Sequence, residues 1–196
     1  TAVRPRVCCR ASMVPTDAST PSRSGRITLV LGVLVPTLAL DLWTKAWAWD
    51  NLRQQAGKVI VDGFFRLEFA FNTGSAFGLL RDADWARAFF IAVTAAALIY
   101  MARLALTLPT RAPSGFIAIG LIAGGALGNL HDRFVRIFLD HHGVVDFIVV
   151  NYWPGKRWPA FNIADAALVA GVLLFMLYLR RHGDQADAPA LAPPAA

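Results

Sequence analysis

Charged residues are scarce in this chain. Asp, Glu, Lys and Arg make up 16% of its 196 residues, whereas 56% of the residues are hydrophobic. An average soluble domain contains about 25% charged and about 45–50% apolar residues. This shortage excludes an intrinsically disordered chain, which is rich in charge and poor in apolar residues, and it argues against most soluble enzymes. The length allows one domain with a tail.

Acidic residues are fewer than basic ones, but the excess does not create a nucleic-acid-binding face. The net charge is +6, and the first 26 residues supply +4 of it through five Arg (Arg4, Arg6, Arg10, Arg23 and Arg26) and one Asp (5 − 1). The remaining charge is nearly balanced, so we expect no nucleic-acid partner. Basic residues that flank apolar blocks are typical of anchors at a membrane surface.

Metal-binding and nucleophile motifs are also missing. The only two cysteines, Cys8 and Cys9, are adjacent, which makes a disulfide between them unfavourable, and no CxxC or Cys/His spacing is present. Neither HExxH nor GxSxG occurs. A zinc site could be sought in four residues, His131, Asp140, His141 and His142, but three of them adjoin in one loop. We therefore expect no metal and no cofactor.

The apolar residues are gathered into four blocks. Each block is close to the roughly 20 residues that cross a hydrocarbon core about 30 Å thick. The first also follows a basic residue, as a signal peptide would, but Asp41 and Lys45 inside it argue against cleavage. The blocks predict an all-α membrane protein with four transmembrane helices, over Ile27 to about Trp49, about Trp85 to Leu106, about Gly115 to Phe134 and about Ile163 to Leu179.

The segments outside the blocks are polar. We expect residues 1–26 to be a disordered N-terminal extension and residues 182–196 to be a flexible tail, which leaves residues 27–181 as one membrane domain. Four crossings place both termini on the same side. Basic residues at Arg103, Arg111 and Arg180–Arg181 favour the cytoplasmic side for both, against four basic residues in the loop 50–84.

The first long loop contains a strand pattern. Phe65, Leu67, Phe69 and Phe71 alternate with polar or small residues, which predicts a half-buried strand, and Asn72–Thr73–Gly74 predicts a turn after it. We expect a small sheet at the membrane surface between the first two helices. The second long loop, 135–161, mixes aromatic and basic residues as the headgroup layer requires, at Tyr152, Trp153, Lys156, Arg157 and Trp158.

Polar residues at the block edges are the candidates for function, because a charge at bilayer depth costs about 2.5–3.5 kcal/mol and is usually paired or functional. Asp41 and Lys45 are four residues apart, the favourable spacing for an ion pair on a helix. Such a pair either eases insertion near the interface or positions a site.

In the third block, Gly120, Gly124 and Gly128 form a smooth ridge that admits close helix packing, and polar residues follow on one face. These are Asn129, Asp132 and Arg133. We expect Asp132 to be held ionised by its neighbour Arg133, as a scaffold rather than a proton carrier.

Two further acids point to chemistry. Asp146 lies among apolar residues in GVVDFIVV, where burial is expected to raise its pKa. Asp165, in FNIAD at the start of the fourth block, suits a first-turn acid capped by Asn162. Two carboxylates at one membrane face can share a proton and activate a water, which hydrolyses a peptide bond without metal. The same acids would also suit a small transporter or proton channel, and a non-enzymatic scaffold is a third hypothesis.

Five blocks of this sequence, in order, resemble the signature blocks of lipoprotein signal peptidase (signal peptidase II), a bacterial aspartic peptidase family: DLWTK (41–45), FNTGSAFG (71–78), GGALGNLHDR (124–133), GVVDF (143–147) and FNIAD (161–165). The resemblance spans roughly residues 27–181. It implies four helices in the inner membrane with cytoplasmic termini, an extracytoplasmic sheet and an active site near that face.

The resemblance also implies an activity and a set of site residues. The activity is removal of signal peptides from prolipoproteins, with cleavage before a diacylglyceryl-modified cysteine, by Asp146 and Asp165. Residues that fall on orienting positions are Asn72, Asn129, Arg133 and Asn162; Asp41 and Lys45 fall on the first block, and Asp132 on a structural position. Prolipoproteins and membrane lipids are the expected partners of a monomer. The link of 13 residues between Asp132 and Asp146 is longer than is usual in the family.

Overall fold

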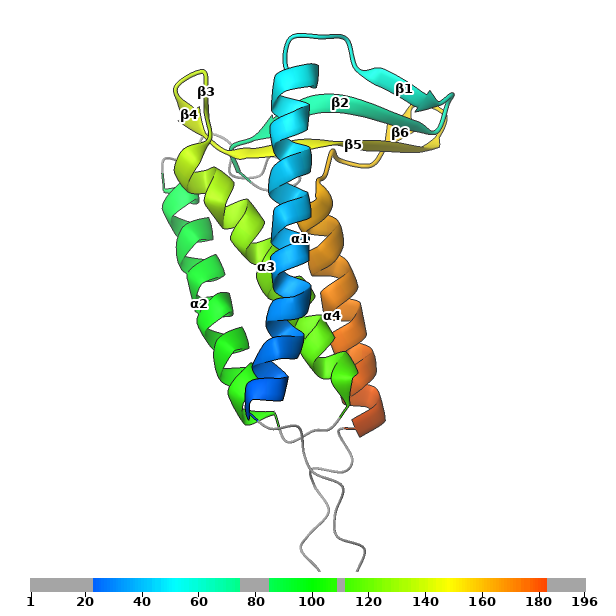
Figure 1. The fold of residues 1–196 in the computed structure, drawn as a ribbon. Coiled ribbons are helices and arrows are strands. Elements are labelled where there is room, and N and C mark those ends of the chain that lie inside the picture. The colour runs from blue at the N-terminus through cyan, green and yellow to red at the C-terminus, as the bar shows by residue number, and fades with distance from the viewer. Residues whose placement is uncertain (1–22, 75–84, 109–111, 183–196) are drawn as a thin grey trace, which may run out of the picture.

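The computed structural model describes residues 23–74, 85–108 and 112–182. Four helices run up and down in a bundle, and a small sheet lies across one end of it (Figure 1). The helices are α1 (Arg23–Leu52), α2 (Ala86–Thr107), α3 (Pro113–Val135) and α4 (Ile163–His182). The four predicted helices are therefore confirmed. The helix α1 begins four residues earlier than expected, while residues 1–22, with Cys8 and Cys9, and 183–196 lie outside the described residues.

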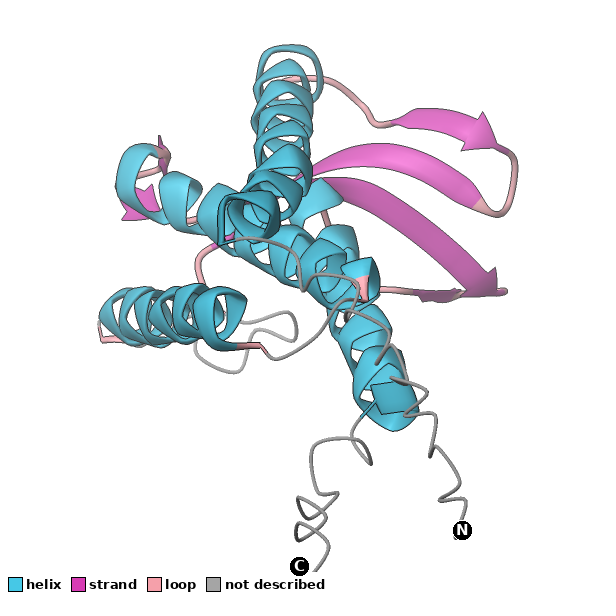
Figure 2. Cartoon of the chain, turned by 60° about the horizontal axis from the view of Figure 1, so that its bottom comes forward, coloured by secondary structure: helices cyan, strands magenta, loops and turns pink. Residues whose placement is uncertain are grey.

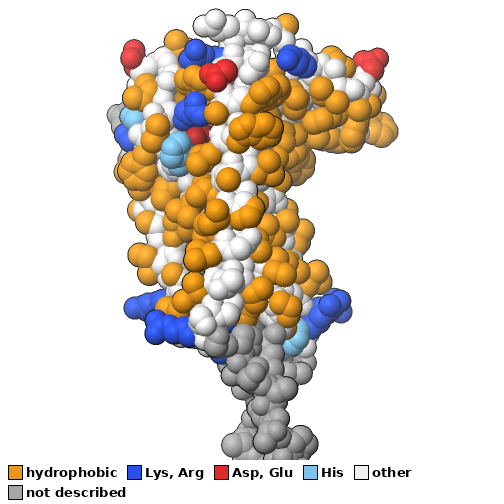
Figure 3. Space-filling view, viewed as in Figure 1, with side chains coloured by type: hydrophobic (Ala, Val, Ile, Leu, Met, Phe, Trp, Pro, Cys, Tyr) orange, Lys and Arg blue, Asp and Glu red, His pale blue; other side chains and the backbone are white. Residues whose placement is uncertain are grey.

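All four helices are long and apolar enough to cross a membrane. The helix α2 is the clearest case, because it is apolar on every side and only Ala86 and Ala105 in it are buried. A helix with no polar face is solvated better by lipid than by water. In the space-filling view, apolar side chains cover the middle of the molecule and charged side chains gather at its two ends (Figure 3).

The central helix is α3, whose glycines allow both neighbours to come close. A Cβ at Gly120 would lie 2.8 Å from the Val30 oxygen of α1, and one at Gly124 would lie 2.9 Å from Thr37 Cβ. On another side, a Cβ at Gly125 would lie 2.5 Å from the Ala164 oxygen of α4. The predicted glycine ridge therefore packs against α1, and α3 holds α1 and α4 together.

The sheet is antiparallel, with the strand order β1 (Lys58–Val61), β2 (Phe65–Asn72), β5 (Val144–Trp153) and β6 (Lys156–Arg157). Figure 2 shows it projecting sideways from the bundle. The strand β2 confirms the alternation seen in the sequence. The sheet does not belong to the first loop alone, however, because β5 and β6 come from the segment between α3 and α4. The prediction of a sheet formed only between the first two helices was therefore too narrow.

The long link after α3 folds into a hairpin of two short strands, β3 (Ile137–Phe138) and β4 (His141–His142), which pair with each other. Its turn holds Leu139 and Asp140 in left-handed backbone conformations, with φ of 48° and 64°. The Phe138 ring packs against Trp49 of α1 and Phe71 of β2, with ring centres 6.1 and 5.6 Å apart. The extra residues of the link thus pack an aromatic side chain against α1 and the sheet.

Candidate active site

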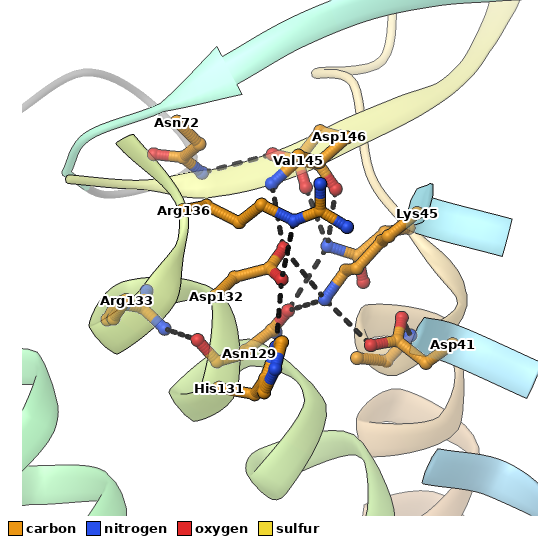
Figure 4. Close-up of polar contacts among 12 residues, drawn as sticks. Asp41, Lys45, Asn72, Asn129, His131, Asp132, Arg133, Arg136, Val145 and Asp146 are labelled. Atoms are coloured by element: carbon orange, nitrogen blue, oxygen red, sulfur yellow. Dashed lines mark hydrogen bonds and ion pairs between the residues drawn. The ribbon is translucent and has the colours of Figure 1, made fainter. Parts of the chain in front are cut away.

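Asp146 is placed by the pairing of β2 with β5. Asn72 is opposite Val144, and because side chains two positions apart share a face of a strand, Asn72 and Asp146 lie on the same face. Asn72 Nδ2 donates to Asp146 Oδ2 at 3.2 Å (Figure 4). The side-chain Oδ1 of Asn72 accepts a hydrogen bond from the Gly74 N–H at 3.1 Å. This bond confirms the predicted turn and directs the Asn72 amide nitrogen toward the Asp146 carboxylate.

Asp165 lies in the first turn of α4 and forms a reciprocal cap with Asn162. The Asp165 N–H donates to Asn162 Oδ1 at 2.9 Å, and the Asn162 N–H donates to Asp165 Oδ2 at 3.2 Å. The predicted cap is therefore confirmed. The second oxygen of Asp165 accepts a hydrogen bond from Asn129 Nδ2 of α3 at 2.8 Å. Two N–H donors thus hold the carboxylate in a fixed orientation.

Asn162 connects the two acids. While its backbone and Oδ1 bond Asp165, its Nδ2 donates to Asp146 Oδ1 at 2.7 Å. Asn162 is fully buried and Asp146 is 3% exposed. Burial, and secondarily the negative charge of Asp165, raises the pKa of Asp146 to about 7. Asp146 can therefore hold a proton at pH values at which an ordinary carboxyl group has lost it.

A buried charge cluster lies beside this pair. Lys45 Nζ lies 2.8 Å from Asp41 Oδ2 and 3.6 Å from Asp132 Oδ2, and all three side chains are completely buried (Figure 4). The predicted ion pair within α1 is therefore confirmed. Lys45 Nζ also donates to Asn129 Oδ1 at 2.8 Å, so this cluster is joined directly to the residue that bonds Asp165.

The predicted pairing of Asp132 with Arg133 is wrong. Among the described residues, the ionic partners of Asp132 are Lys45, Arg136 at 3.7 Å and, when it is protonated, His131 at 3.4 Å. Adjacent residues on a helix point in different directions, so they do not face each other.

Arg133 has other contacts. Its Nη1 donates to the backbone oxygen of Asn129 at 3.3 Å, and its guanidinium lies 5.0 Å from the centre of the Phe90 ring of α2. Within the described ranges it makes no hydrogen bond or ion pair with either Asp146 or Asp165. The charge of Arg133 interacts with those of Asp165 and Asp146, so Arg133 lies near the acids without being bonded to them.

Sequence reasoning missed several contributors. Arg136 contacts Asp132 at the ion-pair spacing of four residues, a signal that was present in the sequence. The backbone N–H groups of Val145 and Ala164 donate to the carboxylates of Asp132 and Asp41, which no sequence pattern could have identified.

In the part of the chain that the structure describes, no group of three or more His, Cys, Asp or Glu side chains is placed to hold a metal ion.

The arrangement suits acid–base chemistry on a water molecule. One carboxyl group can accept a proton while the other donates one, and the Asn amides and backbone donors hold both in place. Asn162 donates to both carboxyl groups, to Asp146 through Nδ2 and to Asp165 through its backbone N–H.

Comparison with known proteins gives a consistent result. The sequence model of the family described as Signal peptidase (SPase) II matches residues 33–181. The chain is 34% identical over 158 residues to a lipoprotein signal peptidase of Oleidesulfovibrio alaskensis, covering 80% of this chain and 97% of that protein. It is 38% identical over 157 residues to one of Xanthomonas oryzae pv. oryzae, covering 78% and 88%.

Solved structures agree. The fold resembles a bacterial membrane enzyme structure with a TM-score of 0.70 and 26% identity, over 85% of this chain and 96% of that one. A second bacterial membrane enzyme structure matches with a TM-score of 0.68 and 29% identity, over 78% of this chain and 93% of that one.

Proposed function

Because the chain belongs to the signal peptidase II family, a family of lipoprotein signal peptidases, we propose that it removes signal peptides from prolipoproteins with Asp146 and Asp165 as the catalytic pair. The observation that supports this pair is Asn162, which bonds both carboxyl groups although they come from β5 and α4: its side-chain Nδ2 donates to Asp146 and its backbone N–H donates to Asp165. A residue that bonds both carboxyl groups keeps them close, as a water-activating pair requires.

The reaction needs one proton on the pair. A water molecule between the carboxyl groups gives a proton to the ionised one as its oxygen attacks the scissile carbonyl carbon. The protonated carboxyl group gives its proton to the carbonyl oxygen, which forms a tetrahedral gem-diol. When that intermediate collapses, the C–N bond breaks, the carboxyl group protonated in the first step gives its proton to the leaving nitrogen, and the other carboxylate takes the proton of one gem-diol hydroxyl. The products are a carboxylic acid and the amine of the new N-terminus, and the pair again holds one proton.

The remaining polar residues have supporting roles in this proposal. Asn72, Asn129 and Asn162 orient the carboxyl groups through their hydrogen bonds. Arg133, which makes no ion pair with a described residue and donates from Nη1 to the Asn129 backbone oxygen, contacts the backbone of a substrate near the acids. Asp41, Lys45 and Asp132 support the site as the buried charge cluster beside it. The substrate is a diacylglyceryl-modified prolipoprotein cut before the lipid-bearing cysteine, the enzyme acts as a monomer among membrane lipids, and no cofactor takes part.

The charges at the ends of the helices support the orientation that we propose in the membrane. The ends of the helices that are distant from the sheet carry five Arg and no Asp or Glu among the described residues (Figure 3). These are Arg23, Arg26, Arg103, Arg180 and Arg181. Under the positive-inside rule this end lies in the cytoplasm, so both termini are cytoplasmic and the sheet and the acids lie at the extracytoplasmic face of the inner membrane.

The test is an assay of the purified full chain on a precursor that carries a diacylglyceryl-cysteine. The variants Asp146→Asn and Asp165→Asn keep the shape of each side chain but remove its acid–base function. We expect each to lower kcat by about 10²–10⁴-fold. Asp140→Asn, in the exposed turn of the β3–β4 hairpin, is the matched control and should cleave at the normal rate. Normal cleavage by either of the first two variants would exclude the proposed pair.

A second arm compares substrates. The same precursor without its diacylglyceryl group should be cut poorly or not at all. If the purified protein in liposomes carried ions or solutes and left the lipidated precursor intact, the chain would be a transporter instead.

A further inference from the structure

Each proposed catalytic acid follows a residue whose backbone is held by a buried carboxylate. The N–H of Ala164, which precedes Asp165, donates to Asp41 Oδ1 of α1 at 2.8 Å. The N–H of Val145, which precedes Asp146, donates to Asp132 Oδ2 of α3 at 3.1 Å. Two segments that are distant in sequence, the start of α4 and the strand β5, are therefore bonded in the same way to two different helices.

A single ammonium group joins these two carboxylates. Lys45 Nζ contacts Asp41 Oδ2 at 2.8 Å and Asp132 Oδ2 at 3.6 Å, and none of the three side chains is exposed. Without the ammonium, two buried negative charges would face each other and move apart. Each carboxylate would take with it the backbone N–H that it accepts.

Lys45 reaches the acids by a third route as well. Asn129 Oδ1 accepts hydrogen bonds from Lys45 Nζ at 2.8 Å and from Asn162 Nδ2 at 3.2 Å. With its oxygen fixed by two donors, the amide can only direct its nitrogen the other way, where Nδ2 bonds Asp165 Oδ1 at 2.8 Å. The ammonium thereby determines which end of the Asn129 amide faces the acid.

We propose that Lys45 is a positioning residue that sets the distance and orientation between Asp146 and Asp165, through Asp41 to Ala164, through Asp132 to Val145 and through Asn129 to Asp165. The inference rests on the proposed function. It goes further than an ion pair that eases insertion of α1, because such a pair needs only Asp41 and Lys45. Here the second oxygen of Asp41, the whole of Asp132 and the amide of Asn129 are bonded to the elements that carry the acids.

The test removes the ammonium without leaving buried charges. The triple variant Asp41→Asn, Lys45→Met, Asp132→Asn is neutral, close in volume to the original cluster, and keeps side-chain oxygens that can accept the two N–H groups. Thr44→Val is the matched control, because the Thr44 hydroxyl bonds only the oxygens of Leu40 and Asp41 within its own helix. The full chain is assayed on the lipidated precursor, with kcat, KM and the thermal midpoint measured for each protein.

Misplacement of catalytic groups by about 1 Å can cost about 10²-fold, so we expect the triple variant to lose kcat by about that factor. Its KM and thermal midpoint should stay close to those of the control, since the substrate contacts and the packing are retained. A merely structural cluster would change the midpoint and spare kcat. A folded triple variant with normal kcat, or one that loses only KM, would overturn the inference.

Should the triple variant not fold, Lys45→Met, Asp132→Asn takes its place under the same criteria, because the remaining Asp41 can take up a proton. If neither folds, the cluster serves folding and the separate positioning role is rejected. Asp146→Asn is measured alongside. An inactive Asp146→Asn with a fully active triple variant rejects this inference alone, whereas an active Asp146→Asn rejects the proposed function.

Discussion

Asn162 and Asp165 hydrogen bond each other twice, the backbone N–H of each donating to the side-chain oxygen of the other. One residue pair therefore begins the helix α4 and orients an acid at the same time. The two roles use different atoms of Asn162, because its Oδ1 makes the cap and its Nδ2 bonds Asp146. Substitutions at position 162 can separate them.

Asn162→Ser should keep the cap and lose the bond to Asp146. Ser is as good an N-cap residue as Asn, so we expect the thermal midpoint to stay near that of the original protein, while kcat falls because Asp146 is no longer oriented. Asn162→Ala should lower kcat similarly and in addition cost about 1 kcal/mol of stability. Thermal unfolding and cleavage kinetics of both variants test this. Equal stability of the Ser and Ala variants would contradict the capping role.

The proton on the acid pair should make cleavage sensitive to pH. Since burial and the charge of Asp165 raise the pKa of Asp146 to about 7, the pair loses its proton as the pH rises beyond that value. We expect kcat/KM for the lipidated precursor to decline above about pH 7, because this ratio reports the ionisation of the free enzyme. A rate that stays level to pH 9 would show that the proton is held elsewhere.

The same shift predicts how stability varies with pH. The folded protein binds the Asp146 proton more tightly than the unfolded chain does, since the ordinary value of this pKa is 3.8. The contribution is complete below about pH 4, is lost as the pH rises to about 7, and does not change above that. Asp146→Asn removes it. The thermal midpoint of the variant minus that of the original protein should therefore increase between pH 4 and pH 7, and an equal difference at both would contradict the prediction.

Two glycine substitutions in α1 and α3 should have opposite outcomes. A Cβ at Gly128 would collide with the Asp41 carboxylate, whereas one at Gly32 would meet nothing within 4 Å. We expect Gly128→Ala to displace Asp41 and lower both stability and kcat. Gly32→Ala should be neutral or stabilising, because Ala favours a helix over Gly by about 1 kcal/mol. Thermal midpoints and cleavage rates compare them, and equal effects would refute the close contact of α3 with Asp41.

The proposed orientation can be tested by labelling. With Cys8 and Cys9 replaced by Ser, single cysteines are introduced at Lys156 in β6 and at Arg181 near the end of α4, both exposed. In intact cells, a thiol reagent that crosses the outer but not the inner membrane should label the cysteine at 156 and spare the one at 181. The reverse pattern would place the sheet in the cytoplasm.

The helices were predictable because a lipid-facing helix needs only length and apolar composition. The strand β2 was predictable because one of its faces is polar, which leaves an alternating pattern. The strand β5 was not, since Val144, Val145, Asp146 and Phe147 are buried in succession and give no alternation. A strand covered on both faces cannot be distinguished from any other short apolar run.

The residues of the candidate site were predictable from the sequence, but the contacts between them were not. Asp146, Asp165 and the asparagines stood out as polar residues beside apolar blocks. Their partners did not, because Lys45 reaches Asn129 across 84 positions in sequence. The error over Asp132 has the same origin. Adjacency suggested Arg133, but the cations that reach the carboxylate are Arg136, the residue just after α3, and Lys45 on α1.

The pairing of β2 with β5 has a consequence for synthesis of the protein. Phe71 pairs with Val145, so β2 is synthesised before its partner β5, and the helices α2 and α3 are made in between. Until then β2 has an unpaired edge toward β5, and Asp146 has no Asn162 to bond. The proposed pair also needs Asp165 at the start of α4, so a nascent chain that ends before α4 cannot assemble the pair, and we expect no proteolytic activity from it.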